Sequence, residues 1–246
     1  MMTPSPLIAR LTDYYNIRGI GAINFSCPHR RECAAGAPQF TPATESFVGP
    51  EYERGTAPRL LFLSLDSGSG KDDASLRTMA SVRAREMARD IEALHKNKHW
   101  YLTHELAFVL LRQFVPGLKM SRVNRYFAHV NSAKCCQNNP QRRQASSILF
   151  DNCREFIPGE LRILEPDVIV TQGGQAGKIV GGFRRIDTPA AESTAVVRCG
   201  ERNALWIKTY HPAAYGKFHP QRRTMWPLFE KALGEFMRQR RVERKR

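Results

Sequence analysis

The chain has 246 residues, of which 42% are hydrophobic and 25% are charged, which is typical of a globular domain with a sizeable core and excludes a disordered chain. Lysine and arginine number 38 against 23 aspartate and glutamate residues, so the formal net charge of +15 favours a polyanionic partner, above all nucleic acid. No apolar run approaches the ~18 residues of a membrane span, and the N-terminus has no secretory pattern, which predicts a cytoplasmic protein.

Short apolar runs rich in β-branched or aromatic residues predict four buried strands, at residues 60–65, 126–130, 167–171 and 204–210. Helical patterns lie between them. Met87, Ile91 and Leu94 share one helix face, and further helices are expected at residues 102–114, 150–164 and 224–242. Pro158 must break the third of these or start its second half.

Strands that alternate with helices predict one α/β domain over residues 1–246, a three-layer α/β/α sandwich with a mostly parallel four-stranded central sheet. Residues 1–58 are expected to form a strap across the fold, and residues 237–246 a basic tail. The tail, Arg142-Arg143 and residues 219–223 would neutralise phosphates without reading sequence, although the tail also fits a solvated helix end.

A polar residue follows each predicted strand. Asp66 follows the first, Asn131 the second, the Gln172-Gly173-Gly174 segment the third and His211 the fourth. Because ligands bind beyond the carboxyl ends of the strands in such sheets, these groups are expected to converge on one edge.

Six cysteines are present: Cys27, Cys33, Cys135, Cys136, Cys153 and Cys199. Disulfides are not expected in a chain without a secretion signal, so the clustered cysteines suggest a metal or an iron–sulfur site.

The order strand–SLDSG, strand–NSAKC, strand–VTQGG, strand–YHPAA resembles the uracil-DNA glycosylase superfamily, with the iron–sulfur-containing branches as the closest match. The resemblance implies that Asp66 activates water, that Asn131 reads a flipped base and that His211 stabilises the departing base. The first motif departs from the family, since Ser64 and Ser67 replace the usual Gly and Pro.

The same resemblance implies a 4Fe–4S cluster held by Cys27, Cys33, Cys135 and Cys153, with structural zinc as the alternative. The spacing of the first pair, CPHRREC, is wider than the common C-x-x-C. Cys136 could replace Cys135 as the third ligand. Cys199 matches nothing in the family and fits a plain buried thiol.

Two features bear on the substrate. Gly68 stands where uracil-specific members place a Tyr that blocks a C5 methyl group, which leaves room for a C5-substituted pyrimidine. Trp100 and Tyr101 precede a predicted helix where the resemblance implies an aromatic that stacks on the base, such as Tyr101, although a core aromatic is the commoner role. The loop after the last strand is expected to enter the DNA minor groove through Pro212, Ala213, Tyr215 and Lys217.

The sequence thus predicts a monomeric, monofunctional DNA glycosylase that binds DNA and no membrane. It would release uracil or a C5-modified pyrimidine and leave an abasic site, in base-excision repair or in defence against modified phage DNA. The alternative is a non-catalytic iron–sulfur or zinc protein that binds nucleic acid on the same fold. Each site residue also has a structural alternative, with Asp66 as a helix cap, Asn131 as a turn cap and His211 as a structural histidine.

Overall fold

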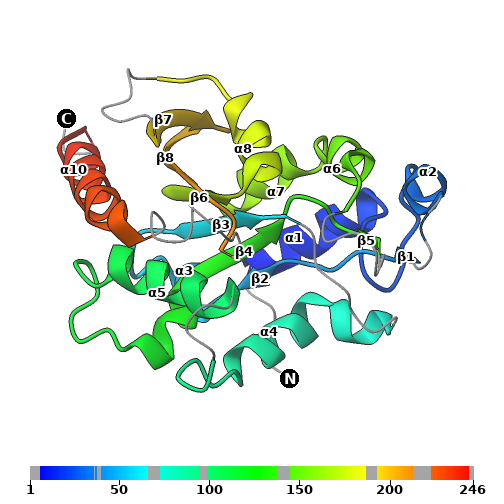
Figure 1. Ribbon diagram of the computed structural model, residues 1–246, viewed down its shortest axis with the longest axis horizontal. Helices are drawn as coiled ribbons and strands as arrows, with labels where there is room; N and C mark the ends of the chain where they lie inside the picture. The colour runs from blue at the N-terminus through cyan, green and yellow to red at the C-terminus, as the bar shows by residue number, and fades with distance from the viewer. Residues whose placement is uncertain are drawn as a thin grey trace.

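A computed structural model describes residues 6–35, 37, 40–65, 73–94, 99–137, 145–186, 193–212 and 223–243. Its centre is a six-stranded sheet with the order β2-β4-β3-β6-β8-β7 (Figure 1). A second, two-stranded sheet pairs β1 (Phe40–Thr41) with β5 (Cys136–Gln137). In the described part of the chain, no helix is long and apolar enough to cross a membrane.

The four predicted strands form the parallel centre of the large sheet, as β4 (Phe127–Asn131), β3 (Leu60–Ser64), β6 (Val168–Gln172) and β8 (Arg202–Thr209). Two antiparallel edge strands, β2 (Phe47–Val48) and β7 (Thr194–Cys199), extend the sheet beyond the four expected strands. β2 is too short to leave a sequence pattern.

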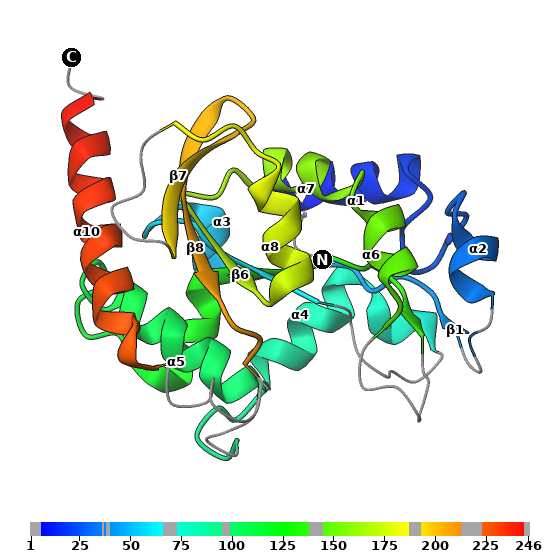
Figure 2. The same cartoon turned by 45° about the horizontal axis from the view of Figure 1, so that its top comes forward.

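Helices cover both faces of the sheet, which confirms the three-layer sandwich (Figure 2). One layer holds α1 (Pro6–Ile17), α7 (Ile157–Leu164) and α8 (Gly174–Gly181). The other holds α4 (Met79–Met87), α5 (His99–Leu111) and α10 (Trp226–Glu243). Shorter helices lie at the connections, namely α2 (Arg30–Ala34), α3 (Pro50–Arg54), α6 (Ser147–Cys153), η1 (Ala74–Arg77) and η2 (Met120–Tyr126).

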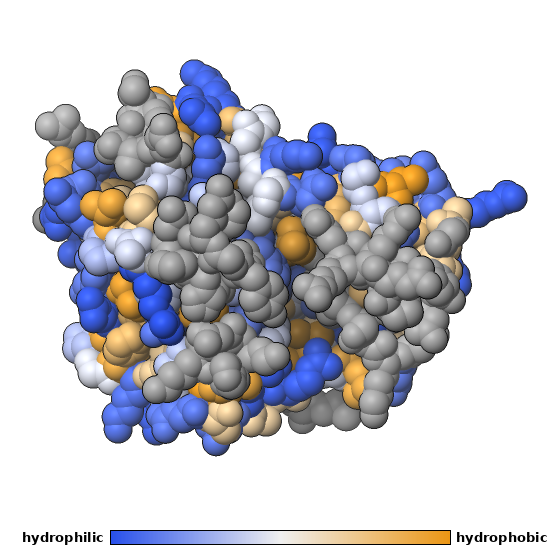
Figure 3. Space-filling view, viewed as in Figure 1, coloured by the Kyte–Doolittle hydropathy of each residue, from blue (hydrophilic) through white to orange (hydrophobic). Residues whose placement is uncertain are grey.

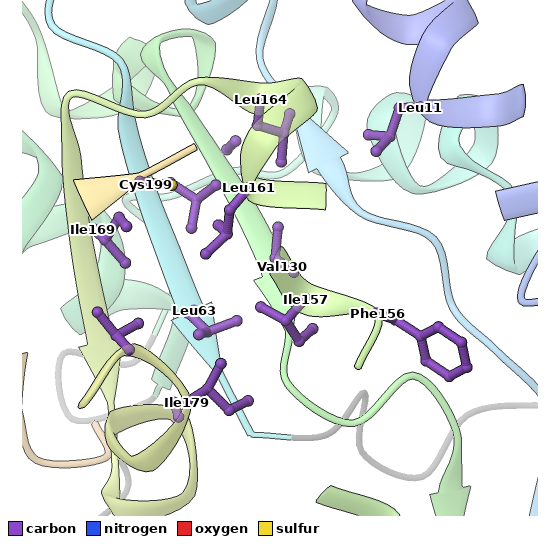
Figure 4. Packing of buried hydrophobic residues seen from close by; sticks show 14 of the residues in the cluster. Leu11, Leu63, Val130, Phe156, Ile157, Leu161, Leu164, Ile169, Ile179 and Cys199 are labelled. Carbon is purple, nitrogen blue, oxygen red and sulfur yellow. The ribbon is translucent and has the colours of Figure 1, made fainter. Parts of the chain in front are cut away.

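The parallel strands are apolar on both faces, as expected for a sheet covered twice. Leu63, Val130 and Ile169 point towards Ile157 and Leu161 of α7 (Figure 4). The alternate positions of the same strands pack against α5 and α10. Each fully buried aliphatic side chain of this kind contributes roughly 1.5–3 kcal/mol.

The predicted helix through Met87, Ile91 and Leu94 is wrong, because α4 ends at Met87. The Asp90 carboxylate accepts hydrogen bonds from the backbone N–H groups of Glu92 (3.0 Å) and Ala93 (3.2 Å). A short acidic side chain that binds nearby backbone in this way competes with helical hydrogen bonds.

The other helix predictions are confirmed. Pro158 sits in the first turn of α7, where its missing N–H costs nothing, and the chain between α6 and α7 breaks as expected. The last helix continues to Glu243, and the Arg240 guanidinium pairs with Asp167 at the start of β6. Part of the basic tail is therefore ordered helix with a structural ion pair.

The N-terminal segment binds the domain at a buried ion pair between Lys134, after β4, and Glu160 of α7. The two side chains are 1% and 0% exposed. The Lys134 ammonium lies 2.6 and 2.8 Å from the two carboxylate oxygens. Ser46 Oγ donates to the same carboxylate at 3.0 Å, and the Tyr15 hydroxyl lies 3.1 Å from it. The contacts join α1, the approach to β2, the loop after β4 and helix α7.

We expect Glu160→Ala to lower the free energy of unfolding by about 3–5 kcal/mol, because it leaves the Lys134 ammonium buried without a counter-charge. Urea denaturation measures the change. Glu235→Ala is the matched control, since Glu235 faces Lys231 at 4.0 Å on the exposed side of α10, and its loss should cost at most about 1 kcal/mol. An equal decrease in the free energy of unfolding in the two variants would contradict the greater cost expected for breaking the buried pair.

Candidate functional site

The carboxyl ends of the four parallel strands carry polar residues that share one face of the sheet. Ser64, Asn131, Gln172 and Thr209 end β3, β4, β6 and β8. Residues two positions earlier, such as Phe62, Val170 and Ile207, pack in the core beneath α5 and α10. Since side chains alternate along a strand, the four polar residues also lie on that side. They form a polar end to an otherwise apolar layer.

Of the predicted site residues, Asn131 and His211 come to this common edge. Asn131 is 7% exposed and is the register partner of Ser64. Gly173 adopts φ +105°, and a Cβ there would lie 3.3 Å from Leu65 Cδ2 and 3.4 Å from His211 Cβ. A glycine at this point therefore lets the ends of β3, β6 and β8 meet closely.

The other predicted residues are distributed differently. Asp66, Gly68, Ala213, Tyr215 and Lys217 lie outside the described residues. Pro212, expected to contact DNA, is buried. Tyr101 lies in the first turn of α5 rather than before the helix and is half-buried.

Three histidines that the sequence reasoning missed surround the edge together with His211. The His99 ring lies 5.0 Å from the His211 ring and 6.2 Å from the His129 ring, measured between centroids. Trp100, the neighbour of the predicted Tyr101, packs at 4.8 Å on His129 and at 6.0 Å on His104. A weak signal was present, because His129 precedes Asn131 by two positions and so shares its face of the strand.

A continuous hydrogen-bond chain crosses the edge from β4 to α5. His129 Nε2 bonds Ser64 Oγ at 2.8 Å, and Ser64 Oγ donates to Gln172 Oε1. Gln172 Nε2 donates to Thr103 Oγ1 at 2.9 Å, and Thr103 Oγ1 donates to the carbonyl of His99 at 2.9 Å. The chain fixes the start of α5 relative to the strand ends.

The surroundings hold two of these histidines neutral. Burial lowers the pKa of His129 to about 4, and it also lowers the pKa of His99, with further lowering from the charges of His129 and His211. Burial alone would raise the pKa of Glu86, but hydrogen bonding and charge from His104, with help from Arg89, lower it overall. His104 Nε2 and Arg89 Nε lie 2.9 and 2.8 Å from the two Glu86 oxygens.

A cavity of about 600 Å³ opens beside the edge. Gln172 and Pro212 line it next to the histidines, while its walls come from α5 and α10 and its polar rim from the end of β8. The remaining lining residues are Leu102, Leu106, Ser193, Lys208, Thr209, Tyr210, Thr224, Met225, Trp226 and Phe229. Its volume lies in the range of sites for small molecules.

The four cysteines predicted as ligands lie within reach of one another's charge. Charge on Cys153, Cys27 and Cys33 acts to raise the pKa of Cys135, and charge on Cys33 and Cys27 acts likewise on Cys153. The neighbouring Cys136 instead sits in β5 opposite Thr41. Cys199 lies at the end of β7, in the core beneath α7.

Polar hydrogens point at two of these sulfurs. The backbone N–H of Lys134 donates to Cys153 Sγ at 3.3 Å, and the Asn152 amide donates to Cys33 Sγ at 3.4 Å. Burial raises the pKa of Cys153 to about 11 and that of Cys135 further, so a metal would have to displace their protons. Four cysteine thiolates are the usual ligands of an iron–sulfur cluster, so the residue types fit such a group. Within the described ranges, no group of three or more His, Cys, Asp or Glu side chains is arranged to hold a single metal ion.

The protein thus has an α/β fold, and its candidate site, with Asn131 and His211, lies at the carboxyl ends of the parallel strands. Residues 75–233, more than half of the chain, match the family described as the uracil DNA glycosylase superfamily, so the chain belongs to that family. The matched region contains Asn131 and His211 but begins after Asp66. No curated protein matches the chain.

Proposed function

We propose that this protein is a monofunctional DNA glycosylase that hydrolyses the N-glycosidic bond of uracil or of a C5-modified pyrimidine and leaves an abasic site. The observation that carries the proposal is that Asn131 and His211 share the carboxyl edge of the sheet in a chain of this family. Strand cleavage is not part of the proposal, because the sequence motifs contain no lysine placed to act as an amine nucleophile.

The residues divide the chemistry between base and sugar. The Asn131 amide offers both a donor and an acceptor, which suits the Watson–Crick edge of a pyrimidine. A hydrogen bond from His211 would stabilise negative charge on the departing base, and the Asp66 carboxylate would stabilise the sugar cation and orient water. The base must first leave the helical stack, at a cost of a few kcal/mol.

Positive charge would offset that cost. The net charge of +15 favours DNA as the partner of a monomeric, cytoplasmic enzyme. Figure 3 shows hydrophilic side chains spread over the visible face rather than gathered in one patch. Several arginines already form ion pairs within the fold, such as Arg223 with Glu105 at 2.7 Å and Arg240 with Asp167.

The cavity beside His211 supports the C5-modified part of the proposal. It is much larger than a C5 methyl group requires, and the Trp226 and Phe229 rings offer flat apolar surfaces beside polar groups such as Lys208 and Tyr210. The small residue Gly68, where uracil-specific members carry Tyr, points to the same preference. A bulky modified base would place the enzyme in defence against foreign DNA, and uracil alone would place it in repair.

The proposal includes a 4Fe–4S cluster on Cys27, Cys33, Cys135 and Cys153. Its support is the mutual proximity of the four thiols and the N–H groups directed at Cys153 and Cys33. When bound, the cluster would supply a cross-link between the N-terminal segment and the loop after β4. Zinc on the same thiols is the alternative.

Base release tests the activity directly. Purified protein is incubated with DNA that contains uracil, a thymine mismatch, hydroxymethylcytosine or its glucosylated form, and abasic sites are counted. We expect Asp66→Ala and His211→Ala each to slow release about 10²–10⁴-fold. No release from any substrate, with DNA binding intact, would instead favour a non-catalytic binding protein on this fold.

A pocket-filling variant tests where a C5 substituent lies. Thr224→Trp places a large ring at the rim of the cavity, and we expect it to lower release of the bulky base at least about 10-fold while uracil release stays within about 3-fold. Leu228→Trp is the matched control, since Leu228 lies four residues further along the chain, is exposed in α10 and does not line the cavity. Equal effects on both bases would contradict this placement.

Two neighbouring cysteines allow a sharp test of the cluster. After anaerobic purification we expect about four irons and four sulfides per chain, with a brown colour. Cys135→Ser should abolish that content, whereas Cys136→Ser and Cys199→Ser should keep it. Stoichiometric zinc in place of iron, or iron loss in Cys136→Ser alone, would contradict the assignment.

A further inference from the structure

The imidazole of His99 faces that of His211 across the candidate site. The ring centroids are 5.0 Å apart and the planes differ by 30°, which is a tilted stack. The two rings come from distant parts of the chain, one from the first turn of α5 and the other from the segment after β8. A packed ring face restricts how the opposite ring can turn.

His99 is itself held at two points. Its backbone carbonyl ends the hydrogen-bond chain that runs from His129 through Ser64, Gln172 and Thr103. Its ring is also hydrogen-bonded to the Gln172 side chain, and this bond acts to raise the pKa of His99 against the lowering by burial. The same amide donates to Thr103 and accepts from Ser64, so it is itself part of the hydrogen-bond chain.

The charges around His99 favour its neutral form. His129, His211 and His104 act on it from β4, from the segment after β8 and from α5 itself, and each disfavours a proton on the His99 ring. The carboxylate of Glu86 pairs with His104 and is shared with Arg89. Two adjacent imidazoles in such a site carry at most one proton at low cost. A neutral His99 can therefore pack against His211 in either of the latter's protonation states.

We propose that His99 is a positioning residue that fixes the ring orientation of His211, held in turn by Gln172 and the hydrogen-bond chain across the strand ends. The inference rests on the proposed role of His211 at the departing base. His99 itself need not touch the substrate. Removing its ring takes away one contact that limits how the His211 ring can turn, and a misplacement of about 1 Å can cost on the order of 10²-fold in rate.

Two readouts test the proposal, and the first does not need activity. Histidine labelled with ¹⁵N in the ring reports the tautomer and pKa of His211 in the folded wild type, His99→Ala and His99→Phe. We expect His99→Ala to shift the His211 nitrogen signals towards those of a free imidazole. His99→Phe, which keeps a flat ring face, should retain most of the wild-type pattern. Unchanged His211 signals in folded His99→Ala would overturn the proposal.

The second readout is base release on the substrate that the wild type prefers. We expect His99→Ala to lower kcat by about 10- to 100-fold with KM within about 3-fold, and His99→Phe to recover most of the loss. A wild type that releases no base would overturn the proposed function while the spectra still decide the role of His99. An active wild type with full kcat in His99→Ala would overturn the positioning role alone.

Discussion

The buried ion pair between Lys134 and Glu160 is the constraint on which the site depends. Such a pair adds little net stability by itself, but loss of one partner is costly, because the other charge is left without water or counter-charge. The pair therefore fixes the position of the loop after β4 against α7. Tyr15 and Ser46 from the N-terminal segment bind the same Glu160 carboxylate.

That loop serves both candidate centres. Asn131 ends β4 at the polar edge, Lys134 is anchored three residues later, and Cys135 follows directly. The backbone N–H of Lys134 also donates to Cys153, so one residue binds Glu160 through its side chain and a candidate ligand through its backbone. Asn131 and Cys135 are thus held on one short loop that is anchored between them at Lys134.

The sequence was enough to predict what depends on local pattern. The four parallel strands are unbroken apolar runs, and their order of polar endings placed Asn131 and His211 at one edge. Apolar spacing alone was not enough elsewhere. The Asp90 turn replaced a helix whose apolar spacing was correct, and a strand of two residues such as β2 leaves no pattern. His99, His104 and His129 belong to no sequence motif, and only the fold brings them together around Trp100.

The anchoring of the N-terminal segment has a consequence for synthesis on the ribosome. Tyr15 binds Glu160 across 145 residues, so the segment with Cys27 and Cys33 has no docking site until α7 has emerged. The Gln137 side chain donates a hydrogen bond to the carbonyl of Cys33, 104 residues earlier in the chain. Translation of that stretch takes about 5 to 20 s. For that time the two early thiols exist in a nascent chain without their later neighbours. Any group held by all four thiols is therefore inserted only after Cys153 has been made.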